Sequence, residues 1–366
     1  MAVTYRVSPP FEARSHLMVF LGGIVLALSS PFINHWFLPV SFADVFRSVP
    51  PRYVNYGFMA DAIETGGNVD VLVVGASDAE TAFDPKVLSE ELSAKLGRSI
   101  RVLNFGANWY GAEAYYARVQ GALSNLKVKV VVALDSFGSA AYPHELAKYW
   151  WLYPRAAIPA SLSLRERATL YATTMLGAPR RSWADLHGVS NLRIAPEFQA
   201  AAALRERTLG FNGVRQGWSD GGPSAKYANV THPLPEVPLA SLFYRNAKDD
   251  EFVNFYGEYS AYQTAFLRKM DEIVRAQGGV FAMASTPVAS SGKLSDKAFV
   301  RPLWHDEPRS WPQFGIATAR LFDGLSDDEA HAFYYNEYHL NASGAKLYSR
   351  AIVPALAKLL SDAEQR

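Results

Sequence analysis

The chain has 366 residues, which is enough for one large domain or two ordinary ones. Its formal net charge is only +1, so it lacks the basic field that bulk nucleic-acid binding needs, and we expect no nucleic-acid partner. It contains no cysteine, which excludes disulfides, zinc sites built on thiolates and a cysteine nucleophile.

The first predicted element is an apolar segment near the start of the chain. Leu17–Leu28 reads LMVFLGGIVLAL, and the run without charge continues to Ala43, with Arg6 and Arg14 ahead of it. A secretory signal, a buried core helix, or a transmembrane helix from Leu17 to about Leu38 would each fit this pattern. We favour an uncleaved anchor over residues 1–44, because roughly 20 apolar residues cross the hydrocarbon core. The positive residues ahead of the span predict a single-pass protein of the inner (cytoplasmic) membrane, with a cytoplasmic N-terminus and a periplasmic domain.

Strands and helices alternate along the rest of the chain. Continuous apolar runs are typical of buried parallel strands. The spacing of apolar residues between these runs is helical. The runs are Val69–Gly75, Ser99–Gly106, Val128–Asp135, Gly278–Pro287 and, with a weaker pattern, Ala317–Leu325, and the helical segments are Pro85–Leu96, Ala112–Leu126, Tyr259–Gln277 and Ala342–Leu360. This alternation predicts an α/β domain over residues 45–366, with a parallel sheet covered by helices on both faces.

A long interval, residues 142–258, separates the third and fourth predicted strands. It contains an aromatic stretch, an amphipathic stretch and a Gly- and Pro-rich stretch from Gly210 to Pro238. We interpret it as an inserted, mainly helical cap or partner-binding region.

Polar residues gather where the predicted strands end, which is the functional edge of an open parallel sheet. This set offers a serine, a histidine and several amide donors, which together suit acyl transfer through a covalent serine ester. His339 would take the proton of Ser77, and backbone N–H groups with an Asn amide would hold the oxyanion. The residues are Ser77 and Asp78; Asn104, Gly106 and Asn108; Asp135 and Ser136; Ser285 and Thr286; and Asn336, Glu337 and His339.

Three blocks carry a family resemblance. DVLVVGASDAETAFDP (Asp70–Pro85), NFGANWYG (Asn104–Gly111) and NEYHLNASG (Asn336–Gly344) resemble the blocks of the SGNH/GDSL hydrolase superfamily. The closer likeness is to its membrane-anchored periplasmic branch, which includes the alginate O-acetylation proteins and the D-alanyl transfer protein of teichoic acids.

The resemblance implies a flavodoxin-like α/β/α sandwich that transfers or removes an acyl group, in particular acetyl, on a cell-surface polysaccharide. Ser77 would be the nucleophile and His339 the base, with Ser77, Gly106 and Asn108 forming the oxyanion hole. A membrane-bound O-acyltransferase would be the partner. We expect no cofactor and no metal, since the other histidines show no spacing typical of metal ligands.

Two positions depart from the family pattern. The superfamily has Asp three residues before the histidine, where this chain has Asn336, and its third block carries an Asn where this chain has Ala133 to Ser136. An Asn can orient an imidazole but cannot stabilise imidazolium by charge. Either Asn336 only orients His339, or Glu337 or Asp135 supplies the acid, or the chain is a catalytically impaired module that binds glycan or docks to the acyltransferase.

Other interpretations stay open at this point. Ser77 could simply cap the helix after its strand, and His339 could make a structural bond at the start of the last helix. Asn341 is expected to cap that helix in any case. A secreted esterase without a partner is a further alternative.

Overall fold

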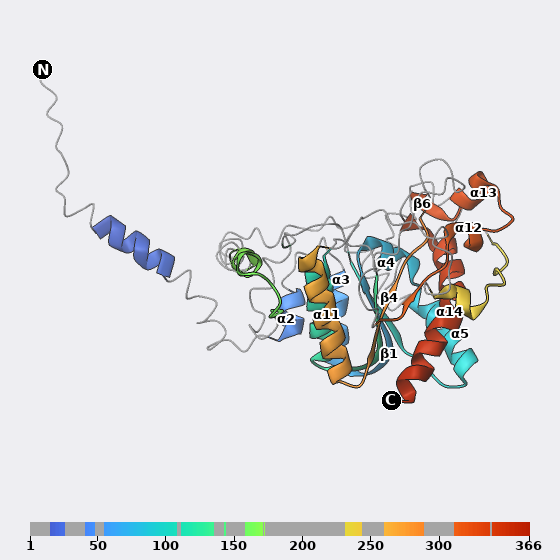
Figure 1. Ribbon diagram of the computed structural model, residues 1–366, viewed down its shortest axis with the longest axis horizontal. Helices are drawn as coiled ribbons and strands as arrows, with labels where there is room; N and C mark the ends of the chain where they lie inside the picture. The colour runs from blue at the N-terminus through green and yellow to red at the C-terminus, as the bar shows by residue number, and fades with distance from the viewer. Residues whose placement is uncertain are drawn as a thin grey trace, which may run out of the picture.

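A parallel sheet of five strands lies at the centre of the computed structural model, which describes residues 15–25, 41–47, 55–107, 111–134, 143, 158–170, 172, 231–243, 260–288, 311–336 and 339–366 (Figure 1). The strands lie in the order β2-β1-β3-β4-β5, and every adjacent pair is parallel. This order is one of the two common orders of doubly wound sheets, and it confirms the predicted α/β class. The strands are β1 (Gly67–Gly75), β2 (Val102–Gly106), β3 (Leu126–Leu134), β4 (Val280–Ala284) and β5 (Gln313–Phe314).

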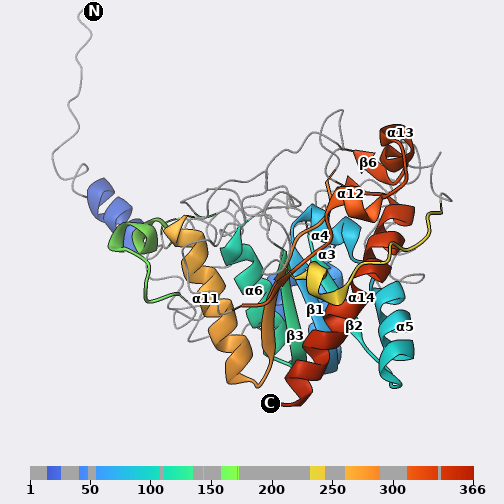
Figure 2. The same ribbon diagram turned by 45° about the vertical axis from the view of Figure 1, so that its right-hand side comes forward.

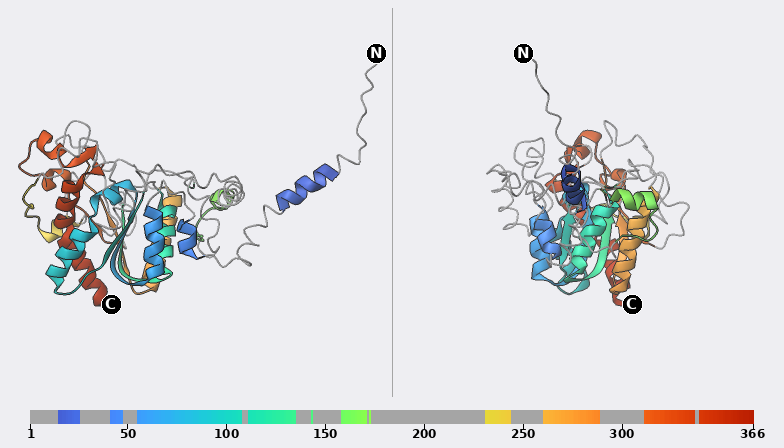
Figure 3. Two further views of the ribbon diagram at one scale, coloured as in Figure 1. Left: turned by 180° about the vertical axis from the view of Figure 1, so that it is seen from behind. Right: turned by 90° about the vertical axis from the view of Figure 1, so that its left-hand side faces the viewer.

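Helices cover both faces of the sheet (Figure 2). Alternate residues of β1 explain why: Leu72 and Val74 belong to one buried cluster, while Val71 and Val73 belong to the other. A strand that is buried on both sides reads as a continuous apolar run, which is the pattern seen in the sequence. One face carries α3 (Asn55–Thr65), α6 (Ala112–Leu123) and α11 (Ala261–Ala276), and the other carries α4 (Ser77–Ala82), α5 (Pro85–Leu96) and α14 (Ala342–Glu364) (Figure 3).

The bounds of α5 are those predicted, because local signals fix both ends. Asp84 is the N-cap, and its carboxylate accepts the N–H groups of Lys86 and Val87. Pro85 occupies the first helical position, where a missing N–H costs nothing. Gly97 ends the helix in the left-handed conformation, at φ 66°.

The predicted strand over Ala317–Leu325 is wrong. Its first part forms the short helix α12 (Thr318–Leu321), in which the N–H of Leu321 reaches the carbonyl of Ala317. Leu321 and Phe322 are buried together, so the apolar pattern came from one face of this turn and not from a strand. The fifth strand lies earlier, at Gln313–Phe314, and is too short to produce a pattern of its own. The elements after α12 are α13 (Asp327–His331) and an antiparallel hairpin of β6 (Tyr334–Asn336) and β7 (His339–Leu340).

The N-terminal helix of residues 15–25 stands apart from the α/β body (Figure 1). Its apolar side chains are exposed, with Met18 70% and Val19 74% accessible, which rules out the buried-core interpretation for these residues. Among the residues that the structure describes, no helix combines the length and apolarity of a membrane span. The rest of the predicted span, residues 26–40, lies outside the described residues. The α/β body begins with α2 (Phe42–Arg47), whose Ala43 and Phe46 are buried in the core beside α3.

Most of the predicted insertion, residues 142–258, also lies outside the described residues. Two described stretches fall within it. Residues 158–170 include a helical segment, and residues 231–243 include the short helix η4 (Leu239–Leu242). Leu242 packs into the cluster that contains α14.

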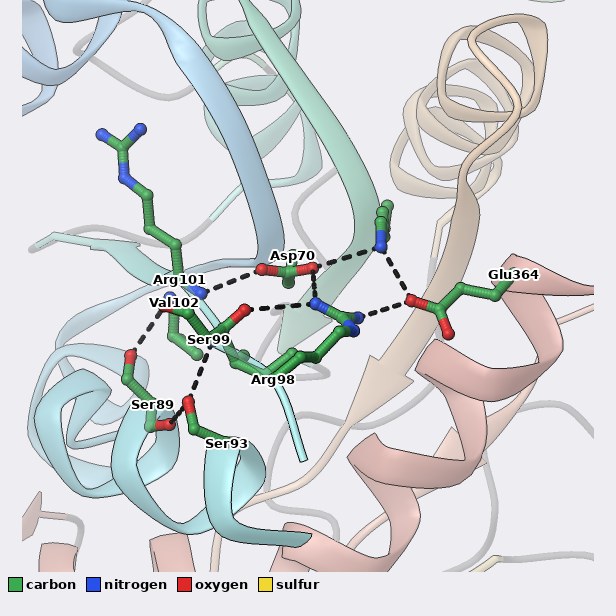
Figure 4. Close-up of polar contacts among 10 residues, drawn as sticks. Asp70, Ser89, Ser93, Arg98, Ser99, Arg101, Val102 and Glu364 are labelled. Carbon is green, nitrogen blue, oxygen red and sulfur yellow. Dashed lines mark hydrogen bonds and ion pairs between the residues drawn. The ribbon is translucent and has the colours of Figure 1, made fainter. Parts of the chain in front are cut away.

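A network of charged side chains lies at the amino end of the strands of the sheet (Figure 4). Asp70 of β1 accepts a bond from Arg98 Nη1 at 2.8 Å and from the backbone N–H of Arg101 at 2.9 Å. Glu364, at the end of α14, contacts Arg98 Nη2 at 2.6 Å and Lys129 Nζ at 2.8 Å. The network therefore fixes the last turn of α14 to β1 and β3.

Candidate active site

Ser77 directly follows the first strand. β1 ends at Gly75, and after Ala76 the chain starts α4 with Ser77 as its first residue. Ala76 is the N-cap, and no side-chain cap bond is made there, so Ser77 does not serve as the helix cap. The strand order places β2 on one side of β1 and β3 on the other, and ligands bind at such a switch point in doubly wound sheets.

The hydroxyl of Ser77 is hydrogen-bonded to His339. Its Oγ lies 2.8 Å from Nε2 of the imidazole, although 262 positions separate the two residues. Both residues are half-buried. The contact that the sequence predicted between Ser77 and His339 is thus present, at a distance that would suit a nucleophile and its base.

The hairpin before α14 carries His339 to this position. His339 begins β7, and its backbone pairs with Asn336 of β6. Asn341 then caps α14, as predicted, by accepting the N–H groups of Ser343 and Gly344 at 3.0 and 3.1 Å. Its amide also donates to the carbonyl of Ala332 at 2.7 Å, at the start of the hairpin, so hairpin and helix are fixed to each other on either side of His339.

Asn104 holds α4 against β2. It is buried, and its Nδ2 donates to the carbonyls of Ala79 and Phe83, each at 2.9 Å. Its Oδ1 accepts the N–H of Gly106 at 2.8 Å. One side chain therefore joins α4, the helix that begins with Ser77, to the end of the neighbouring strand. Sequence reasoning placed Asn104 at a strand end but gave it no role.

Gly106 allows α4 to approach β2 closely. A Cβ on Gly106 would lie 2.5 Å from the backbone nitrogen of Glu80, so no larger residue fits while α4 keeps this position. Its N–H is already bonded to Asn104, and this geometry does not favour the oxyanion role predicted for it. Asn108, the other predicted donor, lies outside the described residues.

The predicted acidic partners of His339 fall outside what the structure describes. This holds for Glu337, for Asp135 and for the side chain of Asn336. Two acidic residues are buried in α4 beside Ser77: Asp78, which the sequence placed at the strand end without a role, and Glu80, which sequence reasoning did not select. A carboxylate oxygen of Asp78 accepts the N–H of Ala79 at 3.0 Å.

The site therefore consists of a serine hydroxyl, an imidazole and the amino end of α4. Within the part of the chain that the structure describes, no three His, Cys, Asp or Glu side chains gather as a metal site requires. No protein-family model and no curated protein matches the chain.

Proposed function

We propose that the protein is a serine-dependent acyl transferase or esterase, with Ser77 as nucleophile and His339 as general base. The single observation that carries this proposal is the 2.8 Å contact between Ser77 Oγ and His339 Nε2. A serine hydroxyl is a weak nucleophile until an adjacent base takes its proton, and this contact supplies the base.

The reaction proceeds in two halves. Nε2 of His339 accepts the proton of Ser77 as Oγ attacks the acyl carbonyl carbon, and that proton passes to the leaving alcohol when its C–O bond breaks. An acceptor hydroxyl, or water in an esterase, then attacks the acyl carbon and gives its proton to Nε2. The bond between that carbon and Oγ breaks, and the proton passes from Nε2 to Oγ, which restores Ser77. The N–H of Ser77 is our proposed oxyanion donor, because amides in the first turn of a helix have no carbonyl partner within that helix.

The proposal extends to the substrate and the setting. The fold is that of the SGNH hydrolases, a flavodoxin-like sandwich, and the substrate is an extracytoplasmic polysaccharide that receives or loses acetyl groups with a membrane-bound O-acyltransferase as partner. The resemblance of the serine and histidine blocks supports the fold, the substrate and the partner. The strand order β2-β1-β3-β4-β5 supports the fold. The exposed apolar side chains of residues 15–25 support a membrane anchor, and Arg6 and Arg14 ahead of them support a periplasmic domain.

Covalent labelling tests the proposal. The full-length chain, purified in detergent, is treated with a fluorophosphonate probe, and its reaction with p-nitrophenyl acetate is followed for a burst. Wild type should be labelled and show acyl-enzyme formation, while Ser77→Ala should lose both and His339→Ala should lose nearly all activity. Acetylation of the cell-surface polysaccharide should fall in cells that carry Ser77→Ala.

Two variants serve as matched controls. Ser361→Ala removes a hydroxyl that donates to the carbonyl of Ala357 within α14, and His331→Ala removes an imidazole whose Nδ1 lies 2.7 Å from the carbonyl of Asp327 in α13. Both should label like wild type. If wild type shows neither label nor burst, and Ser77→Ala leaves polysaccharide acetylation unchanged, the enzyme proposal fails and a glycan-binding or docking module replaces it.

A further inference from the structure

A buried arginine lies directly behind the catalytic edge of the sheet. Arg118 of α6 is fully buried, at 0% exposure. Its Nη1 donates to the carbonyl of Gly75 at 2.5 Å and to the carbonyl of Phe105 at 3.2 Å. Its Nε and Nη2 donate to the hydroxyl of Tyr56 at 3.3 and 3.1 Å. Within the described residues, all of its hydrogen bonds therefore go to neutral oxygens.

Burying a guanidinium in this way is costly, since the charge leaves water and, among the residues that the structure describes, no carboxylate bonds to it. Two aromatic rings reduce that cost, because the guanidinium carbon lies 5.4 Å from the ring centre of Tyr56 and 5.5 Å from that of Tyr115. An apolar side chain would fill the same space without the cost. What an apolar side chain cannot do is bond two carbonyls at once, as the fork of the guanidinium does.

The two carbonyls belong to Gly75, the last residue of β1, and to Phe105, the last residue but one of β2. Gly75 is paired with Gly106, and its oxygen also accepts the N–H of Ala107 at 3.1 Å. Because a peptide unit is planar, fixing the carbonyl of Gly75 also fixes the N–H of Ala76, and so the direction in which the chain leaves for Ser77.

The peptide unit between Phe105 and Gly106 is held at both its carbonyl and its N–H. Arg118 holds the oxygen of Phe105, and Asn104 holds the N–H of Gly106 in the same unit. Asn104 in turn bonds the carbonyls of Ala79 in α4 and of Phe83 at its end. The hydrogen bonds of Arg118 to Gly75 and to Phe105 therefore both connect it to α4, the helix that carries the proposed nucleophile.

We propose that Arg118 is a positioning residue for Ser77, which it holds at the distance and angle needed for attack and for the contact with His339. This inference rests on the proposed function. Sequence reasoning could not find it, since Arg118 lies in an ordinary helical pattern and nothing in that pattern marks its guanidinium as buried.

The test compares Arg118→Met and Arg118→Lys with Arg98→Met, which removes an arginine from the network at the opposite edge of the sheet. Esterolysis of p-nitrophenyl acetate by the full-length protein gives kcat and KM, and thermal unfolding gives stability. Arg118→Met should lower kcat about 100-fold with KM nearly unchanged, the size of effect expected when a reacting group is misplaced by about 1 Å. Arg118→Lys should recover part of the loss, because an ammonium can reach the carbonyls but lacks the fork.

Arg98→Met separates positioning from stability. It should lower the unfolding temperature and leave kcat at the wild-type value. Should Arg118→Met not fold, Arg118→Lys and Tyr56→Phe decide the matter, and each should lower kcat several-fold because the guanidinium is lost or loses its anchor.

The inference about Arg118 would be overturned, and the proposed function would stand, if Arg118→Met folds and keeps the wild-type kcat. Wild-type kcat in both Arg118→Lys and Tyr56→Phe would have the same meaning. Wild-type protein that neither labels nor turns over would overturn the proposed function and the inference with it.

Discussion

The hydroxyl of Ser349 joins two segments that lie 265 positions apart, since it accepts the backbone N–H of Asp84 at 2.8 Å. The same hydroxyl donates to the carbonyl of Ala82 at 3.2 Å, so one side chain bonds both ends of the turn between α4 and α5. Ser349 is fully buried in α14. The bond therefore fixes the helix that begins with Ser77 to the helix that directly follows His339.

Replacing Ser349 with alanine should destabilise the protein. The N–H of Asp84 would lose its acceptor in a partly buried place, which costs about 1–3 kcal/mol in the free energy of unfolding. Urea unfolding of Ser349→Ala measures this loss, and fluorophosphonate labelling of Ser77 should slow in the same variant. Ser361→Ala, at the other end of α14, is the control and should change the unfolding free energy by less than about 0.5 kcal/mol. Equal stabilities for the two variants would show that the Ser349 bond does not hold α4 to α14.

Gly106→Ala should disturb α4, the helix that begins with Ser77. The new Cβ would lie 2.5 Å from the nitrogen and 2.9 Å from the Cα of Glu80, and backbone atoms of α4 cannot move without moving Ser77. We expect a loss of about 1–3 kcal/mol in stability, as for an overpacked core, together with slower labelling. Gly57→Ala is the matched control, because a Cβ there meets nothing within 4 Å and alanine is favoured within a helix. Thermal unfolding should show a lower midpoint for the first variant and an equal or higher one for the second.

Acid stability should depend on Asp70. Burial alone would raise its pKa, but the N–H of Arg101 and the cations of Arg98 and Lys129 outweigh burial and hold the pKa below its usual range. A carboxylate with a depressed folded-state pKa stabilises the protein fully above its unfolded pKa, near 3.9, and that stabilisation is lost as the pH falls through the folded-state value.

The corresponding measurement is urea unfolding of wild type and Asp70→Asn from pH 7 downward. Asp70→Asn should be less stable than wild type at pH 7, and the difference should shrink below about pH 4 as Asp70 of the wild type takes up its proton. Glu91→Gln is the control, since Glu91 pairs with Arg350 on the surface and exposed pairs contribute little. A constant difference between wild type and Asp70→Asn across this window would contradict the role given to Asp70.

Asn336→Asp should show how the imidazole of His339 is supported. Asn336 pairs with His339 across the hairpin, where the superfamily places an acid. If Asn336 only orients the ring, an aspartate should preserve or raise the rate of acyl-enzyme formation, because a carboxylate also stabilises imidazolium. If Glu337 or Asp135 already supplies that charge, Asn336→Asp should change little. Glu337→Gln or Asp135→Asn should then cost about 10²–10⁴ in rate with p-nitrophenyl acetate.

The sequence was most informative where a structural feature depends on residues that lie close together in the chain. The valines of β1 and β3 predicted buried strands, and the helical spacing over Pro85–Leu96 predicted α5, whose ends Asp84, Pro85 and Gly97 fix in the structure. The proximity of Ser77 and His339 could then be predicted, because in a parallel sheet the segments that follow the carboxyl ends of the strands meet at one edge.

What the sequence did not show depends on contacts between distant segments. The strand β5 has two residues, and its pairing with β4 exists only because the sheet is already formed. The bonds of Asn104 and Arg118 to backbone carbonyls leave no mark in the order of residues, since a buried arginine and an exposed one look alike in a helical pattern. The apolar residues Leu321 and Phe322 produced the wrong prediction of a strand over Ala317–Leu325. One turn of helix and a short strand can bury the same side chains, so the apolar pattern alone does not distinguish them.

The distance of 262 positions between Ser77 and His339 also has a consequence in time. A ribosome adds about 5–20 residues per second, so His339 is made about 13–52 s after Ser77. Throughout that interval β1 and α4 can form, but the hydroxyl of Ser77 has no imidazole beside it. If Ser77 is the nucleophile that we propose, a nascent chain carries it without its base, and we expect reactivity to begin only when α14 docks against α4 and α5.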